Sequence, residues 1–191
     1  MQSFSIISGI VGPHAYAEET QKWVHERTGS ATPQGWDNQI DDEPTLNVQY
    51  IDKYRLRYNW YSDTLWYYGG IVGNLNTHAC IGGTVKFGLN VPDNYNIVSL
   101  EPIPTALDQS SLYIFLGVEG RAIVHNIFLD GNTFSDSHSV DKEYFVGDLI
   151  GGISLIVDCL EITYSVHLRS KEFEQQKRDI EYGGISIAYR W

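Results

Sequence analysis

The chain has little of what helical membrane proteins and disulfide-bonded domains require. Its 191 residues include one Met, six Pro and only two Cys. Two cysteines are too few for a disulfide framework, so we expect Cys80 and Cys159 to be unpaired thiols. The longest apolar run, 149–157, is broken by Gly151 and Gly152. It is far shorter than the roughly 18 residues that a transmembrane helix needs.

Basic residues are also scarce. Thirteen Lys and Arg stand against 24 Asp and Glu, which gives a net charge of -11. Binding of nucleic acid depends on basic stripes that release counterions from the phosphates, and this sequence has no such stripe. We therefore expect no nucleic-acid partner. Contact with anionic lipid would need local basic residues or bridging divalent cations.

Aromatic residues and glycine, by contrast, are abundant. The chain has 13 Tyr, 5 Trp and 18 Gly, a usage that favours strands and tight turns. Its last residues alternate without a break between an apolar face (Ile185, Ile187, Tyr189, Trp191) and a small or polar face (Ser186, Ala188, Arg190). One face suits lipid and the other a wet lumen. That pattern is typical of strands in outer-membrane β-barrels.

The same alternation predicts eight strands. They fall at about 2–12, 44–58, 61–74, 77–89, 110–128, 143–157, 159–170 and 182–191. A soluble β-protein that binds a small apolar ligand would also bury one face of its strands and expose the other. The charged inner faces and the aromatic ending favour the membrane instead. We predict an all-β, antiparallel transmembrane β-barrel, with residues 1–191 in a single domain.

Residues 13–29 form the clearest helical segment. Pro13 opens it, acidic residues lie in its early turns, and Gly29 closes it. The C-terminal end of a barrel should be periplasmic, and counting strands back from it places this segment on the outer side, with the connections 129–142 and 171–181. We therefore expect an extracellular loop helix at the level of the lipid headgroups.

Spacing along this helix brings polar side chains together. Glu18, Gln21 and His25 are three and four residues apart and so share one face, which leaves Trp23 and Val24 to pack elsewhere. Histidine is the usual general base near neutral pH. On spacing alone, a solvated helix face with an incidental histidine explains the pattern equally simply.

Three further segments hold polar clusters. Residues 35–43 offer carboxylate and amide oxygens that could hold Ca²⁺, or they form a hydrated loop. Residues 120–142 contain an Asp-Gly-Asn turn signal. Arg169 and Lys171 form a basic pair at a loop rim that could meet lipid phosphates. The sequence has no Gly-x-Ser-x-Gly elbow, His-Glu-x-x-His motif or paired-cysteine metal site.

Four of these motifs together form a pattern that spans essentially the whole chain. They are Gly12-Pro13 with Gln21-x-x-x-His25, Gly35-Trp36-Asp37-Asn38-Gln39, the run from Asn126 to Thr133, and Arg169-x-Lys171-Glu172-Phe173. The pattern resembles the outer-membrane lipid A 3′-O-deacylases. The resemblance implies a twelve-stranded barrel that carries a calcium-dependent ester hydrolase, with lipid A of lipopolysaccharide as its substrate.

The resemblance also assigns roles to residues of this chain. The family's helical histidine activates water for attack on the acyl ester, while Ca²⁺ stabilises the developing oxyanion. His25 matches that histidine, and Gln21 matches the polar residue one turn before it. Arg169 and Lys171 are expected to contact phosphates of the substrate. The calcium ligands are not identified by the resemblance, and we expect some of them to lie outside this sequence.

The sequence also departs from the family pattern. The family has an N-terminal Asn-Asp pair that has no counterpart here, and the segment from Met1 to Ser8 reads as a strand instead of a secretory signal. We therefore expect about four N-terminal strands and an export signal to be missing. The alternative to an enzyme is then a non-catalytic, truncated remnant of such a barrel.

Overall fold

The structure, a computed structural model, describes residues 1–31, 34–95 and 110–189. Its strands are β1 (Gln2–Val11), β2 (Glu43–Asn59), β3 (Ser62–Gly73), β4 (Asn76–Leu89), β5 (Ser111–Asn126), β6 (Phe145–Val157), β7 (Leu160–Arg169) and β8 (Ile180–Tyr189). The helices are α1 (Ala17–Thr28) and the short α2 (Ile127–Asp130), with 3₁₀ turns η1 (Pro13–Ala15) and η2 (Trp36–Asn38). The strand ends lie within two residues of the predicted ones, so the predicted strands are confirmed.

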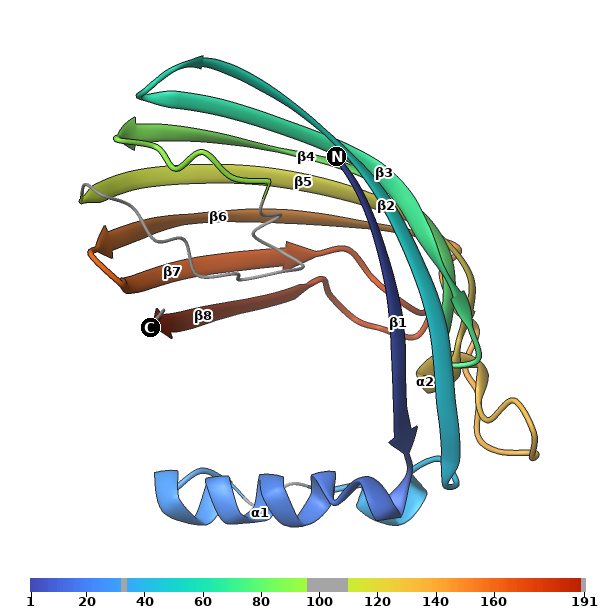
Figure 1. Cartoon of the computed structure of the whole chain (residues 1–191). Helices are drawn as coiled ribbons and strands as arrows, with labels where there is room; N and C mark the ends of the chain where they lie inside the picture. The colour runs from blue at the N-terminus through green and yellow to red at the C-terminus, as the bar shows by residue number, and fades with distance from the viewer. Residues whose placement is uncertain (32–33, 96–109, 190–191) are drawn as a thin grey trace.

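All eight strands form one sheet in the order β1-β2-β3-β4-β5-β6-β7-β8. Each strand pairs antiparallel with the next along the chain. The sheet curves into an open half-barrel, and α1 stands apart from it beyond the end of β1 (Figure 1). Within the described residues, β1 and β8 are the two edges of the sheet. The prediction of an all-β antiparallel barrel fold is confirmed.

The two faces of the sheet differ as the alternation predicts. On β5, the convex face carries the exposed Leu112, Ile114, Leu116 and Val118. The concave face of the sheet holds buried charged groups, which are Glu43, Lys53, Asp63 and Lys86. An apolar outside around a charged inside is the reverse of a soluble protein and is the arrangement of a membrane barrel.

Ion pairs stabilise the charges on the concave face. The Arg55 Nε atom lies 2.8 Å from Asp63 Oδ1, and only 7% and 2% of these two side chains are exposed. On β7, Arg169 Nε donates to Asp148 Oδ1 over 2.7 Å. Arg121 binds the other oxygen of the same carboxylate. In these ion pairs each charge has a partner of opposite sign, which offsets the cost of removing it from water.

Glycines on the concave face make room for aromatic rings. A Cβ atom on Gly82 would lie 2.5 Å from the Tyr67 hydroxyl, and one on Gly152 would lie 2.5 Å from the Phe115 ring. Tyr67 and Phe115 are both buried. The glycine that interrupts the apolar run on β6 is therefore required by packing, because the ring of Phe115 lies over it.

The helical segment differs from the prediction in its first turn. Pro13 begins the separate 3₁₀ turn η1, Tyr16 takes a left-handed conformation with φ 55°, and α1 begins only at Ala17. The prediction of one helix from Pro13 is wrong because η1 is held against the start of β2, as described below. Gly29 ends the helix with φ 68°, as predicted.

The remaining expectations concern the cysteines and the chain ending. Cys80 is buried on β4 and Cys159 is exposed in the turn between β6 and β7, and both thiols are free, as predicted. No helix in the described ranges is long and apolar enough to cross a membrane. Arg190 and Trp191, which complete the alternating ending, lie outside the described residues.

The convex face generates a depth-dependent prediction. Val118 lies at the middle of β5 and Val124 near its end, with 56% and 69% of their areas exposed. Val118→Arg should cost about 2–4 kcal/mol of unfolding free energy in lipid vesicles, because it places a charge at mid-membrane depth. Val124→Arg, the matched control, should cost about 0–1 kcal/mol. Urea titrations measure both, and equal losses would contradict a lipid-facing convex surface.

Candidate active site

Helix α1 carries Gln21 and His25, the two predicted catalytic residues. Glu18 and Glu19 lie in its first turn and Arg27 in its last, which matches the direction of the helix dipole. Lys22 pairs with Glu18 one turn away, and this contact raises the pKa of Lys22. At the C-terminal end, the amides of Gly29 and Ser30 both donate to the His25 carbonyl. This Schellman arrangement reverses the chain directly after the helix.

The reversal fixes the protonation of the His25 ring. The Nδ1 atom of His25 lies 2.6 Å from the carbonyl oxygen of Ala31. A carbonyl oxygen can only accept, so Nδ1 carries the proton in this contact. In the neutral ring, Nε2 then holds the lone pair that a general base needs. Gln21 lies one turn earlier on the same face, with an exposed side chain.

The base of the helical segment is attached to the start of β2. Gly12 has φ 97°, and a Cβ atom there would lie 2.6 Å from Asp42 Cα, so only glycine fits. The His14 amide donates to Asp42 Oδ1 over 2.8 Å, and the His14 ring contacts the other Asp42 oxygen. The Gly12-Pro13 motif therefore serves to bring the chain against residues 41–42 before α1 begins.

A second group of contacts joins the loops at this end of the sheet, which we call the helix rim. Glu43 is only 3% exposed. One of its oxygens accepts from Asn74 (2.8 Å), and the other accepts from Asn132 (3.1 Å) and the Thr133 amide (2.8 Å). We call these four residues the Glu43 cluster. It connects β2, the turn between β3 and β4, and the loop after α2.

Asn132 also binds the loop before β2. Its side chain accepts from the Asp41 amide and donates to the Asp41 carbonyl, both over 2.9 Å. The structure thus brings the segment 35–43 against the segment 126–133, two motifs that lie far apart in the sequence. Beside this contact, between residues 37–41 and 136–138, is a polar hollow of about 480 Å³, lined by Asp37, Asn38, Gln39, Asp41, Asp136, Ser137 and His138.

Arg169 and Lys171 lie elsewhere on the rim. The Arg169 guanidinium donates to Asp148 (2.7 Å) and Glu172 (3.3 Å) on the concave side, whereas Lys171 is exposed in the loop after β7. This loop is joined to residues 141–143, where the Glu143 amide donates to the Glu172 carbonyl over 2.9 Å. Arg169 and Lys171 are thus held beside residues 141–143, whereas Gln21 and His25 lie on α1, whose base is attached to residues 41–42.

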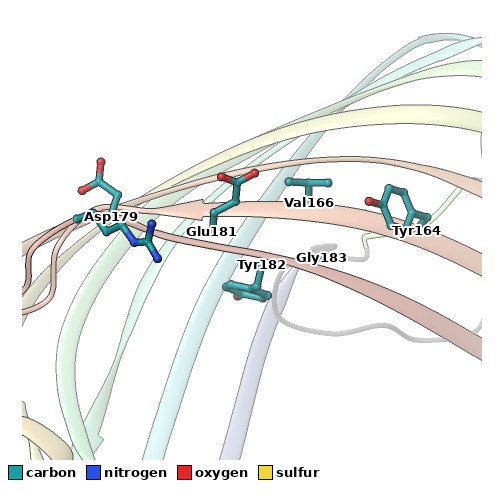
Figure 2. Close-up of a pocket in the computed structure, with 7 residues that line it drawn as sticks. Tyr164, Val166, Asp179, Glu181, Tyr182 and Gly183 are labelled. Carbon is teal, nitrogen blue, oxygen red and sulfur yellow. The ribbon is translucent and has the colours of Figure 1, made fainter. Parts of the chain in front are cut away.

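A second hollow, of about 470 Å³, lies along the edge strand β8. It is lined by Tyr164, Val166, Arg178, Asp179, Glu181, Tyr182 and Gly183. Figure 2 shows Tyr164, Val166 and Glu181 on one side of the sheet and Tyr182 on the other. Tyr182 stacks on His167 with 4.6 Å between ring centroids. None of the predicted catalytic residues lines this hollow.

The comparisons with known proteins agree with this architecture. A family model described as outer membrane protein LpxR matches residues 1–191, the whole chain. The chain belongs to the LpxR family. The resemblance to the lipid A 3′-O-deacylases drawn from the motifs is thereby confirmed, and the family is one of outer membrane proteins.

A solved structure shares the LpxR fold. LpxR from Salmonella typhimurium is similar with a TM-score of 0.81 and 20% sequence identity, over 100% of this chain and 67% of that chain. At this identity the likeness concerns the fold. A search of the curated proteins gave no match.

Of the two interpretations of segment 35–43, a calcium site or a hydrated loop, the described carboxylates do not fit the calcium site. Its carboxylates bind different partners: Asp41 accepts from Ser135, Asp42 from His14, and Glu43 from the Glu43 cluster. In the parts of the chain that the structure describes, no group of three or more His, Cys, Asp or Glu side chains could hold a metal ion. The dependence on calcium that the family resemblance implies stays a prediction.

Sequence reasoning found the helix and its histidine but missed the residues that position them. His14, Glu43 and Asn132 act through partners 28 to 91 positions away, as between His14 and Asp42 or Asn132 and Asp41. A signal for them was present, because Glu43 and Asn132 lie within or beside the LpxR motifs. The alternation of side chains along a strand, taken alone, does not indicate that Glu43 and Asn132 are hydrogen-bonded to each other.

The Glu43 cluster predicts a loop that opens when its carboxylate is removed. In Glu43→Ala, the Thr133 amide loses its acceptor. Because Thr133 is exposed, the loss is that of one hydrogen bond to a charged group, about 1.5–3 kcal/mol. Hydrogen exchange at Thr133 and Asp41 should therefore accelerate about tenfold or more. Asp136→Ala, an exposed carboxylate in the same loop, should leave both rates unchanged. Unchanged exchange in Glu43→Ala would show that the cluster does not hold the loop.

The contact between His14 and Asp42 predicts a pH-dependent attachment of α1. The hydrogen bond raises the pKa of His14 above its ordinary 6.5 and lowers that of Asp42 below its ordinary 3.8. The contact therefore stabilises the loop fully between these ordinary values. It is lost as the pH rises through the raised pKa of His14 or falls through the lowered pKa of Asp42.

Limited proteolysis of the segment 12–43 measures this dependence. The ratio of cleavage rates, His14→Ala over the parent protein, should be largest near about pH 5 and fall toward one at alkaline pH. Dividing the two rates cancels the pH dependence of the protease. A ratio that stays constant across this range would contradict the role of the contact.

Proposed function

We propose that this chain is part of an outer-membrane hydrolase that removes the 3′-O-linked acyl chain of lipid A, with His25 as its general base. The observation that carries the proposal is the contact between His25 Nδ1 and the Ala31 carbonyl, 2.6 Å long. It leaves Nε2 as the basic nitrogen, on a helix at the rim of a barrel of the LpxR family. The family membership supports lipid A as the substrate class.

In this proposal the reaction is ester hydrolysis by an activated water. The His25 Nε2 atom takes a proton from the water as its oxygen attacks the ester carbonyl. Collapse of the tetrahedral intermediate breaks the bond to the sugar oxygen, and the imidazolium returns the proton to that oxygen. The products are a free fatty acid and lipid A with a 3′-hydroxyl group. Gln21, one turn before His25, is placed to orient the water or the ester.

The basic pair at the rim would bind the phosphates of the substrate. Lys171 is exposed in the loop after β7, where a phosphate can reach it. Arg169 would have to exchange its contacts with Asp148 and Glu172 for a phosphate. We therefore propose Lys171 as the stronger contact of the two. The orientation that puts α1 and this loop at the cell surface belongs to the same proposal.

A non-catalytic barrel segment is the second candidate function. The two edges of the sheet, β1 and β8, favour it, because strand edges in lipid leave backbone groups without partners, each at a cost of several kcal/mol. A chain whose edges are not covered by further strands would not hold α1 against a complete site. In that case, His25 would be in place but catalysis would not follow.

The lipid A of cells that export this chain behind a signal peptide tests both candidates. The parent protein should produce lipid A with a mass loss that corresponds to a released acyl chain. His25→Ala should lower this conversion about 10²–10⁴-fold, because it removes the general base. Mass spectrometry of lipid A measures the conversion, and heat-modifiable gel mobility measures barrel assembly.

A matched control lies on the same helix. Glu26 is exposed and follows His25 directly, on a different face, so Glu26→Ala should keep full conversion. Retained conversion in His25→Ala would eliminate His25 as the base. No conversion by the assembled parent protein would favour the non-catalytic candidate.

A further inference from the structure

The connection that follows β4 turns back over the concave side of the sheet. Asn90, directly after β4, has φ 50°, a left-handed conformation that asparagine adopts more readily than most residues. Its side-chain amide donates to the Ser110 carbonyl over 3.0 Å, which joins the start of the connection to the residue before β5. The chain after Asn90 therefore runs back over the neighbouring strands instead of away from the sheet (Figure 1). We call residues 90–95 the inner segment.

The apolar residues of the inner segment are buried. Val91 is 2% exposed, and Pro92 is fully buried as well. The Val91 amide donates to the Trp60 carbonyl, in the turn between β2 and β3, over 2.9 Å. Val91 belongs to one apolar cluster with buried residues on the concave faces of β5 and β6, which are Tyr113, Phe115, Ile150 and Ile156. The inner segment is thus packed against the inside of the barrel wall.

Basic side chains of the concave side bind the polar residues of the inner segment. The Asp93 carboxylate pairs with Arg55 through one oxygen and with Arg57, 3.0 Å away, through the other. The Lys86 Nζ atom donates to Asn94 Oδ1 over 2.9 Å. Only 7% of the Arg55 side chain and 3% of Lys86 are exposed. The inner segment therefore supplies partners to charges that are held inside the protein, where an unpaired charge is costly.

These contacts lie at one level of the sheet and cross several strands. The strand pairing puts Arg57 of β2 opposite Asp63, Asp63 opposite Lys86 of β4, and Lys86 opposite Phe115 of β5. This level is near the end opposite the helix rim, because β2 and β4 end there and β5 begins there. Barrels of more than about eight strands enclose space that the side chains of the wall do not fill, and in some barrels an inward-folded loop occupies it. A segment that contacts β2, β4, β5 and β6 from the inside is placed to do so.

We propose that the inner segment is a plug that closes the barrel at the end opposite the helix rim, so that the barrel conducts neither ions nor small solutes. The packing of Val91 and the ion pairs of Asp93 hold the plug against the wall. The plug goes beyond the proposed hydrolysis and does not rest on it, because passage through the barrel can be measured without any turnover.

Ion conductance across planar lipid bilayers tests the plug. The whole protein is exported behind a signal peptide, and its assembly is checked by heat-modifiable gel mobility. Asp93→Arg puts a positive charge against Arg55 and Arg57, and it leaves the packed core intact because the Asp93 side chain is 69% exposed. The time-averaged current should rise about tenfold or more over the parent protein, since contacts between charged groups are lost. A parent protein that conducts as well as Asp93→Arg would overturn the proposal.

Conservative and matched variants separate the ion pairs from a general effect of charge. Asp93→Glu keeps the carboxylate and should keep the current of the parent protein, whereas Asp93→Asn should raise it. Asp158→Asn is the matched control, because it removes an exposed carboxylate at the same end of the sheet, in the turn between β6 and β7. Asparagine also tolerates the left-handed conformation of that residue, φ 52°. An equal rise in Asp93→Asn and Asp158→Asn would contradict the role of the ion pairs.

Hydrogen exchange locates the inner segment independently of any current. The Val91 amide should be protected in the parent protein and should exchange about tenfold faster or more in Asp93→Arg, because its contact with the Trp60 carbonyl opens with the plug. Fast exchange at Val91 in the parent protein would show that the segment does not lie inside the barrel. Fast exchange in Asp93→Arg without a rise in current would show that the segment does not close it. Either result would overturn the plug.

Discussion

The carboxylate of Glu43 joins three segments at the helix rim, which are the start of β2, the turn between β3 and β4, and the loop after α2. It lies at the first residue of β2, is almost fully buried, and accepts hydrogen bonds from Asn74, Asn132 and the Thr133 amide. Directly before it, Asp42 binds His14 and Asp41 binds Asn132. The position of α1 follows from this sequence of contacts, because the segment that precedes the helix is attached nowhere else as firmly. The catalytic proposal for His25 therefore depends on residues that touch no substrate.

The sheet itself depends on a different constraint, the separation of apolar and charged faces. Charged groups on the concave side, such as Arg55 with Asp63 and Arg169 with Asp148, are paired with each other. The convex side presents apolar side chains to lipid, and bulky rings lie over glycines on the inside. A sheet of this kind is stable only in a bilayer and only with its edges paired. The match to LpxR from Salmonella typhimurium covers 67% of that longer chain.

The features that could be predicted from the sequence depend on neighbouring residues, and those that could not depend on contacts between residues far apart in the sequence. The side chains of a strand alternate between its two faces every two residues, so the sequence of each segment alone indicates a strand. The ends of all eight strands were therefore predictable to within two residues. Helix α1 was predictable from its composition, yet its start was not, because the break at Tyr16 follows from a contact between His14 and Asp42, 28 positions apart. The contact between Arg169 and Asp148 could not be predicted either, because Asp148 lies on the neighbouring strand β6. The family motif predicts His25 as the general base, and its tautomer could only come from the structure.

The acceptor that sets this tautomer is a backbone carbonyl, and that has a consequence for how the site can change over time. No exchange of one side chain for another removes the Ala31 oxygen, so a scan of substitutions at that position would report a tolerant residue. The hydrogen bond depends instead on the number of residues between the helix end at Gly29 and the Ala31 carbonyl that contacts the His25 ring. Insertions and deletions in this short stretch are the changes that can remove this hydrogen bond. Across relatives, the constraint would therefore be visible as a conserved spacing, with little conservation of residue type.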